Sequence, residues 1–276
     1  MLLRFLLTII LACLAGCASN YSAGTRLNNA EVLANSSGWD SVRVGVPNFE
    51  LMAFIPKDAR SGDELTVYIE GDGLAWITPC RPSTNPTPLN PMGLKLALAH
   101  PKGKVAYVAR PCQFVGARAR GCEERYWTNE RFSPEVVAAM SKVVDHLKSR
   151  MQASAVNLVG YSGGGAIAVL IAAKRGDVQR IVTVAGNLDT HRWTQWHGLG
   201  ELSGSINPAD LSMRVSQIPQ WHLAGGKDSN IPPALVHGYA AKFQEASKVK
   251  VLVEDTFTHS CCWAENWAAI WARYIQ

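Results

Sequence analysis

The sequence predicts an α/β fold, in which a mostly parallel sheet is covered by helices on both faces. Apolar runs rich in β-branched residues alternate with helical patterns along the chain. Several of these runs are apolar on both faces, as expected of strands in a parallel sheet covered by helices. With 276 residues, 47% of them hydrophobic and 18% charged, the chain can bury a sizeable core.

Seven apolar runs are expected to form strands. They are Leu51–Ile55, Leu65–Ile69, Val105–Ala109, Ala155–Val159, Ile181–Ala185, Trp221–Ala224 and Val249–Val253. Ser133 precedes Pro134 and Glu135, which is the pattern of an N-cap followed by proline at the first helical position. A further helix is expected from Gly163 to Arg175, where the residues are small and apolar on all sides and therefore buried.

The start of the chain has the pattern of an export signal. Arg4 precedes an apolar run, residues 5–12, that is too short to span a bilayer. The run is followed by Leu14-Ala15-Gly16-Cys17, which resembles a bacterial lipobox. That resemblance implies removal of residues 1–16 and lipid on the Cys17 thiol. An ordinary secretory signal or a short buried helix is the alternative.

The lipobox resemblance also predicts where the protein lies. No Asp retention signal follows Cys17, which by resemblance favours the outer membrane, with the protein facing the periplasm. Residues 17–41 are polar and rich in Asn and Ser, so we expect a tether that carries a domain at residues 42–276.

Charge gives little information about partners. The 27 basic and 22 acidic residues leave a net charge of +5, and no run of Lys and Arg exceeds two residues. This distribution does not indicate a nucleic-acid surface or a polybasic membrane patch.

The most informative junction is Val159-Gly160-Tyr161-Ser162-Gly163-Gly164, where a buried strand turns at once into a buried helix. It matches G-x-S-x-G, in which a sharp turn exposes the serine hydroxyl above the sheet. The glycines are needed because a Cβ would collide with the neighbouring backbone. A phosphate-binding turn is disfavoured, because the segment does not read G-x-G-x-x-G and no Gly-Lys-Ser/Thr follows.

A serine nucleophile needs a base and an acid that orients the base, each on a loop at the carboxyl edge of the sheet. Asp228 follows the strand Trp221–Ala224, and His259 follows the strand Val249–Val253. Asp189, after the preceding strand, is the substitute acid if Asp228 is only a turn residue. The chain order is therefore Ser, Asp, His.

This order, with each residue in a loop after a successive strand, resembles the α/β-hydrolase superfamily over residues 42–276. The resemblance implies that Ser162 attacks a carbonyl, His259 transfers the proton, and Asp228 orients the imidazole. It implies no metal and no cofactor.

The resemblance also locates the donors that stabilise an oxyanion. One is the Gly163 N–H. The other comes from Glu70-Gly71-Asp72-Gly73, where the family usually has His-Gly. Aligning Gly71 with that glycine makes the Asp72 N–H the second donor, with Gly73 as the alternative. Glu70 in place of His is a departure from the pattern.

The connection before the strand at Trp221 is long for a compact βα unit. In this family such an insertion is often a cap, and we expect one at residues 187–218. Trp193 and Trp196 in it either line an acyl pocket or pack the cap down; the sequence leaves this open.

The cysteines predict disulfides if the protein is exported. Cys112 and Cys122 follow one strand and are expected to form a local bridge. Cys80 follows the oxyanion loop, and Cys261 and Cys262 follow His259, so a bridge from Cys80 to one of that pair would join the two loops. The alternative is that all three are thiols.

The resulting function hypothesis is a membrane-anchored serine hydrolase of the carboxylesterase or lipase type, acting on a small-molecule or lipid acyl substrate. Ester, thioester and amide substrates are not distinguished by the sequence. The alternatives are a non-catalytic envelope lipoprotein that keeps the scaffold and an exported peptidase.

Overall fold

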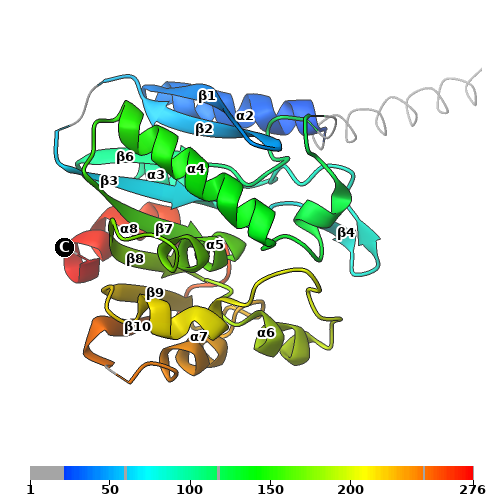
Figure 1. Cartoon of the computed structure of the whole chain (residues 1–276), viewed down its shortest axis with the longest axis vertical. Coiled ribbons are helices and arrows are strands. Elements are labelled where there is room, and N and C mark those ends of the chain that lie inside the picture. The colour runs from blue at the N-terminus through cyan, green and yellow to red at the C-terminus, as the bar shows by residue number, and fades with distance from the viewer. Residues whose placement is uncertain (1–21, 59–60, 117–118, 245, 276) are drawn as a thin grey trace, which may run out of the picture.

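The structure is a computed structural model that describes residues 22–58, 61–116, 119–244 and 246–275. Its centre is an eight-stranded sheet with the order β1-β2-β6-β3-β7-β8-β9-β10 (Figure 1). β1 and β2 pair antiparallel, β2 and β6 pair antiparallel, and all other neighbours pair parallel. The strands are β1 Trp39–Val46, β2 Phe49–Pro56, β3 Glu64–Ile69, β6 Lys104–Val108, β7 Ala155–Tyr161, β8 Val178–Val184, β9 Gln220–Gly225 and β10 Val249–Glu254.

Helices cover both faces of this sheet (Figure 1). They are α2 Ala23–Ser36, α3 Met92–Leu98, α4 Pro134–Arg150, α5 Gly163–Ala172, α6 Thr190–His197, α7 Pro233–Ala240 and α8 Trp263–Ile270. Three 3₁₀ helices, η1 Glu124–Trp127, η2 Pro208–Val215 and η3 Ala246–Lys248, and one π-helix, η4 Trp271–Ile275, are also present in the described residues. One hydrophobic cluster joins α4 and α5 to the sheet, and a second joins α2, α3 and α8 to it. The predicted α/β class, parallel sheet and two helical layers are confirmed.

All seven predicted strands are present, with boundaries shifted by three residues or fewer. The N-cap prediction is also confirmed, because Ser133 Oγ accepts a hydrogen bond from Val136 N at the start of α4. The sequence did not predict β1, the helices α2, α3, α6 and α7, or a separate hairpin of β4 (Trp76–Thr78) and β5 (Arg81–Pro82).

The expected tether is wrong for the part of it that the structure describes. Residues 23–36 form α2, and Ala30 and Ala34 of this helix are buried against the sheet. β1 then begins at Trp39, so the domain starts well before residue 42. The expected signal and Cys17 lie outside the described residues.

The predicted Cys112–Cys122 disulfide is present, with the two Cα atoms 5.4 Å apart. The predicted bridge from Cys80 is wrong. Cys261 is joined to the adjacent Cys262, which uses both thiols of that pair. Cys80 is exposed and unpaired in the turn between β4 and β5.

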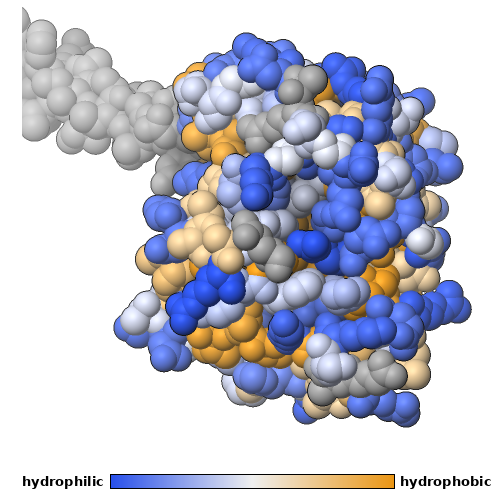
Figure 2. Space-filling view, turned by 90° about the vertical axis from the view of Figure 1, so that its left-hand side faces the viewer, coloured by the Kyte–Doolittle hydropathy of each residue, from blue (hydrophilic) through white to orange (hydrophobic). Residues whose placement is uncertain are grey.

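The carboxyl ends of the parallel strands lie on the side of the molecule that carries β4 and α6 (Figure 1). Figure 2 shows the opposite face, where hydrophilic residues predominate around a smaller hydrophobic area. Within the described ranges, no helix is long and apolar enough to cross a membrane.

Candidate active site

Ser162 occupies a strained turn between β7 and α5. Its φ is +51°, in the left-handed region that residues with a Cβ rarely adopt. The turn is tight: a Cβ on Gly160 would lie 2.2 Å from Gly164 O, and a Cβ on Gly164 would lie 2.3 Å from Ile69 O. The G-x-S-x-G spacing therefore follows from packing, as the sequence reading expected.

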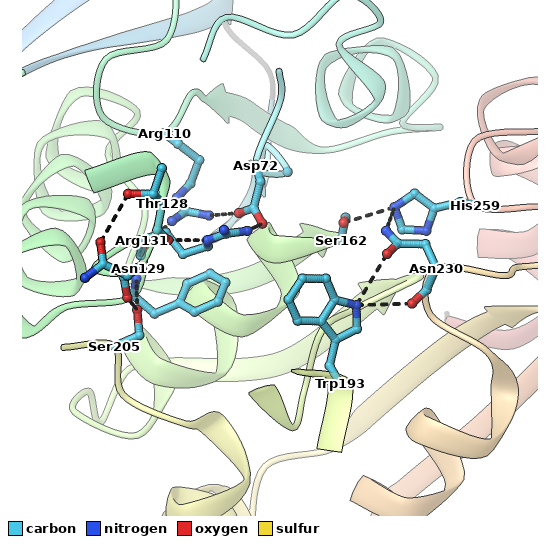
Figure 3. Close-up of polar contacts among 12 residues, drawn as sticks. Asp72, Arg110, Thr128, Asn129, Arg131, Ser162, Trp193, Ser205, Asn230 and His259 are labelled. Atoms are coloured by element: carbon cyan, nitrogen blue, oxygen red, sulfur yellow. Dashed lines mark hydrogen bonds and ion pairs between the residues drawn. The ribbon is translucent and has the colours of Figure 1, made fainter. Parts of the chain in front are cut away.

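The structure brings Ser162, His259 and Asp228 together. His259 Nε2 lies 3.0 Å from Ser162 Oγ (Figure 3). On the other side of the ring, His259 Nδ1 lies 2.8 Å from Asp228 Oδ2. The Asp228 side chain is fully buried, and its Oδ1 accepts hydrogen bonds from the backbone N–H groups of Asn230 and Ile231, each at 2.8 Å. These bonds fix the carboxylate, so it can hold the imidazole with a proton on Nδ1 and a free electron pair on Nε2.

Asp189, the substitute acid, has a different position. It is the N-cap of α6, where its Oδ1 accepts a hydrogen bond from Arg192 N, and its Oδ2 lies 3.7 Å from Lys242 Nζ. The loop after β9 therefore supplies the carboxylate that contacts His259.

The sequence did not predict the contacts that two further side chains make in the site. Asn230 Nδ2 lies 3.2 Å from His259 Nε2, the same nitrogen that faces Ser162. Trp193 Nε1 on α6 donates to Asn230 O and Oδ1, at 3.2 and 3.3 Å (Figure 3). α6 is thereby attached to the base through Asn230. In the sequence, the one feature that could have indicated this contact is the position of Asn230 two residues after Asp228.

The expected cap at residues 187–218 divides into two parts. α6 lies over the site through Trp193, whereas Trp196 is exposed to solvent. η2 packs into the same hydrophobic cluster as α5 through Ala209 and Val215. Only the first part therefore reaches the site.

The two loops that carry the predicted oxyanion donors are in contact. A Cβ built on Gly71 would lie 3.3 Å from Ser162 Cβ, and one on Gly163 would lie 2.0 Å from Asp72 Oδ1, so the β3 loop contacts the Ser162 turn directly. Within the described residues, the N–H groups of Asp72 and Gly163 donate to no protein acceptor. Gly73, the alternative, packs against Pro86.

The Asp72 carboxylate beside Gly163 is held by two arginines. Arg110 Nη1 lies 3.2 Å from one oxygen and Arg131 Nη1 2.7 Å from the other. Burial raises the pKa of Asp72, but the charges of Arg131 and Arg110 outweigh burial and hold this pKa below its ordinary value. The three groups carry a net charge of +1 next to the predicted oxyanion donors, which favours a developing negative charge there.

Glu70, the departure from the family pattern, anchors the oxyanion loop. Its buried carboxylate accepts hydrogen bonds from Tyr107 Oη and from the N–H groups of Gly71, Gly93 and Leu94, at 2.9–3.4 Å. Burial raises the pKa of Glu70, and the four hydrogen bonds act in the opposite direction. Glu70 therefore ties the loop after β3 to the first turn of α3.

We expect Glu70→Ala to lower the free energy of unfolding by several kcal/mol, since each buried donor left unpaired costs about 1–3 kcal/mol. Urea denaturation measures this change. Glu70→Gln keeps one acceptor oxygen and should cost less, and Glu265→Ala, at an exposed position on α8, should be neutral. Equal stability of Glu70→Ala and the unmodified protein would contradict the anchoring role.

Two cavities open at this site. The first, of about 450 Å³, is lined by Ser162, His259, Asp72 and Asn230, and is called the site cavity here. The second, of about 740 Å³, is lined by β4 and β5 residues and by the segment after α6, and is called the hairpin cavity. No cluster of three or more His, Cys, Asp or Glu side chains in the described ranges is arranged to hold a metal ion.

No protein-family model matches the chain, and no curated protein matches it in sequence. Solved structures match it in three dimensions. An esterase from Pyrococcus furiosus has a TM-score of 0.59 at 13% identity, over 86% of this chain and 92% of that one. Est1E from Butyrivibrio proteoclasticus has a TM-score of 0.58 at 13% identity, over 83% and 94%. An alpha-beta serine hydrolase homologue from Coxiella burnetii has a TM-score of 0.53 at 15% identity, over 84% of this chain and 93% of that one. The chain has the α/β-hydrolase fold.

In this α/β-hydrolase fold, Ser162, Asp228 and His259 follow β7, β9 and β10 at the same edge of the sheet. Parallel strands present the loops at their carboxyl ends together, which is why residues 97 positions apart in the chain meet. The likeness to the solved structures is one of fold.

Proposed function

We propose that the protein is a carboxylic ester hydrolase that forms an acyl-enzyme intermediate on Ser162. The observation that carries the proposal is the chain of contacts from Ser162 Oγ to His259 to the buried Asp228. Beside it are the N–H groups of Asp72 and Gly163, which have no acceptor among the residues that the structure describes. A serine, a base and an oriented acid within hydrogen-bond reach form the arrangement that activates a hydroxyl as a nucleophile.

In the first half of the reaction, Ser162 Oγ attacks the ester carbonyl while His259 Nε2 accepts its proton. The N–H groups of Asp72 and Gly163 bind the oxyanion. His259 then donates the proton to the departing alkoxide, and the acyl group stays on Ser162. In the second half, water attacks the acyl-enzyme with His259 as base, which releases the acid and restores the serine.

A fluorophosphonate probe tests this proposal. We expect it to label the folded protein with one adduct on the Ser162 peptide, and prior unfolding in urea should prevent labelling. Hydrolysis of p-nitrophenyl acetate should fall at acidic pH, because a protonated imidazole accepts no proton from serine. A folded protein that is not labelled and cleaves no ester would instead support a non-catalytic role.

Amide substrates distinguish the esterase proposal from the peptidase alternative. A p-nitroanilide matched in acyl group to the ester reports amide cleavage. We expect turnover of the ester and little of the anilide; preferred cleavage of the anilide would make the protein a peptidase.

We also propose that Cys17 carries lipid and anchors the enzyme in the outer membrane, facing the periplasm. The lipobox pattern supports this proposal, and so does the Cys112–Cys122 disulfide, because disulfides persist in oxidising compartments. Cys17→Ser should release the protein into the soluble envelope fraction.

A further inference from the structure

The hairpin cavity adjoins the site cavity. Three side chains, Trp76, Arg131 and Trp193, line both. Trp193 is fixed between them, because its Nε1 is bound to Asn230. A ligand group that starts at Ser162 and passes between Trp193 and Arg131 therefore enters the hairpin cavity.

The hairpin cavity and the base lie on different sides of the nucleophile. Thr128, Asn129 and Arg131, which line the hairpin cavity, lie on one side of Ser162, and His259 lies on the other (Figure 3). His259, Asn230 and Ser260 line only the site cavity. The hairpin cavity is thus on the side away from the base.

This arrangement decides which part of an ester the hairpin cavity takes. His259 must give its proton to the departing alkoxide oxygen, so the alcohol part lies on the His259 side of the scissile carbon. The acyl part, on the other side of that carbon, then points away from His259 and toward the hairpin cavity.

The walls of the hairpin cavity are chiefly apolar. They include Trp76, Ile77, Pro79, Pro82, Leu199 and Leu202. Trp76, Ile77 and Leu199 are also 38–45% exposed to solvent, an unusual exposure for large apolar side chains at the rim of one cavity. Of its charged lining residues, Arg131 is paired with Asp72, and Glu124 and Glu201 are exposed to solvent. A hydrocarbon group would remove this apolar surface from water.

We propose that the hairpin cavity is the acyl subsite and that the preferred substrates are esters of medium- or long-chain apolar acids. This inference rests on the proposed function. The β4–β5 hairpin and the segment after α6 determine acyl length. Each methylene buried there should raise kcat/KM about three- to fourfold until the cavity is filled.

Two isomeric esters test which part enters the cavity. Methyl decanoate carries its long chain on the acyl side, and nonyl acetate carries it on the alcohol side. We expect kcat/KM for methyl decanoate to exceed that for methyl acetate by at least 100-fold. It should also exceed kcat/KM for nonyl acetate. Preference for nonyl acetate would overturn the assignment.

Ile77→Asp places a charge at the rim of the cavity, on a side chain that is already partly exposed, so the fold should be kept. It should lower the ratio of kcat/KM for methyl decanoate to kcat/KM for methyl acetate at least tenfold. Met213→Asp is the matched control, because Met213 is exposed and lies outside both cavities. Equal effects of the two variants on methyl decanoate would overturn the proposal.

Gly200→Trp provides an independent test by filling the cavity. Gly200 lines it, and a Cβ at this position meets no atom within 4 Å. Gly176→Trp is the control, with equally open space at a glycine outside the described cavities. We expect only Gly200→Trp to shift preference toward short acyl chains. If methyl acetate is hydrolysed and chain length has no effect in any variant, the subsite is wrong and the esterase proposal stands; if no ester is hydrolysed, the esterase proposal itself fails.

Discussion

Ser162→Ala is expected to lower kcat for ester hydrolysis by a factor of about 10³–10⁶, the range seen when a serine nucleophile is removed from such a triad. The residual rate would come from the oxyanion donors and substrate binding. The melting temperature should hardly change, because alanine keeps the Cβ and loses only a hydroxyl that points toward His259. Steady-state kinetics on p-nitrophenyl esters, with thermal unfolding of the same samples, measures both.

Ser260→Ala is the matched control for this change. Ser260 lines the same cavity and directly follows His259, but it is exposed and takes no part in the contacts between Ser162, His259 and Asp228. This variant should keep activity within a few-fold of the unmodified protein. Retention of most activity by Ser162→Ala would refute the assignment of the nucleophile.

Asp228→Asn should lower kcat by about 10³–10⁴. An asparagine oxygen can still accept from Asn230 N and Ile231 N, so the loop is kept. Its amide nitrogen would then face His259 Nδ1 and donate to it. The imidazole proton would move to Nε2, which would no longer accept a proton from Ser162.

Asp189→Asn serves as the comparison for this second change, because it alters an aspartate at the same edge of the sheet that caps α6 instead of contacting His259. We expect at most a several-fold loss of kcat there. A larger loss in Asp189→Asn than in Asp228→Asn would mean that the acid has been assigned to the wrong loop.

The strands and the order of the three site residues were predictable because buried strands and tight turns leave local signals. β2, β3 and β6–β10 contain short apolar runs, and the Ser162 turn needs glycines at fixed spacing. α2 leaves a weaker signal, because its buried apolar residues are the small Ala30 and Ala34, while Leu27 and Leu33 are only partly buried and Val32 is exposed. β1 is an edge strand with several exposed positions.

Contacts between distant segments were not predictable. The meeting of Asn230 with Trp193 depends on how α6 returns over the sheet, and no local pattern records that path. The disulfides illustrate the same point. Cys112 and Cys122 are ten residues apart within one loop, so their bridge follows from proximity in the chain. Pairing of Cys80 depended on the relative placement of two loops, and the adjacent cysteines bonded to each other instead.

The cluster of Asp72, Arg110 and Arg131 has a consequence for how the chain changes over evolutionary time. Its members come from three separate segments, and loss of any one leaves a buried charge with too few partners. Substitutions at these positions should therefore occur together in related chains. A covarying set of one aspartate and two arginines with this spacing would identify relatives of this chain. The G-x-S-x-G pattern does not distinguish them from other proteins, because many unrelated sequences share it.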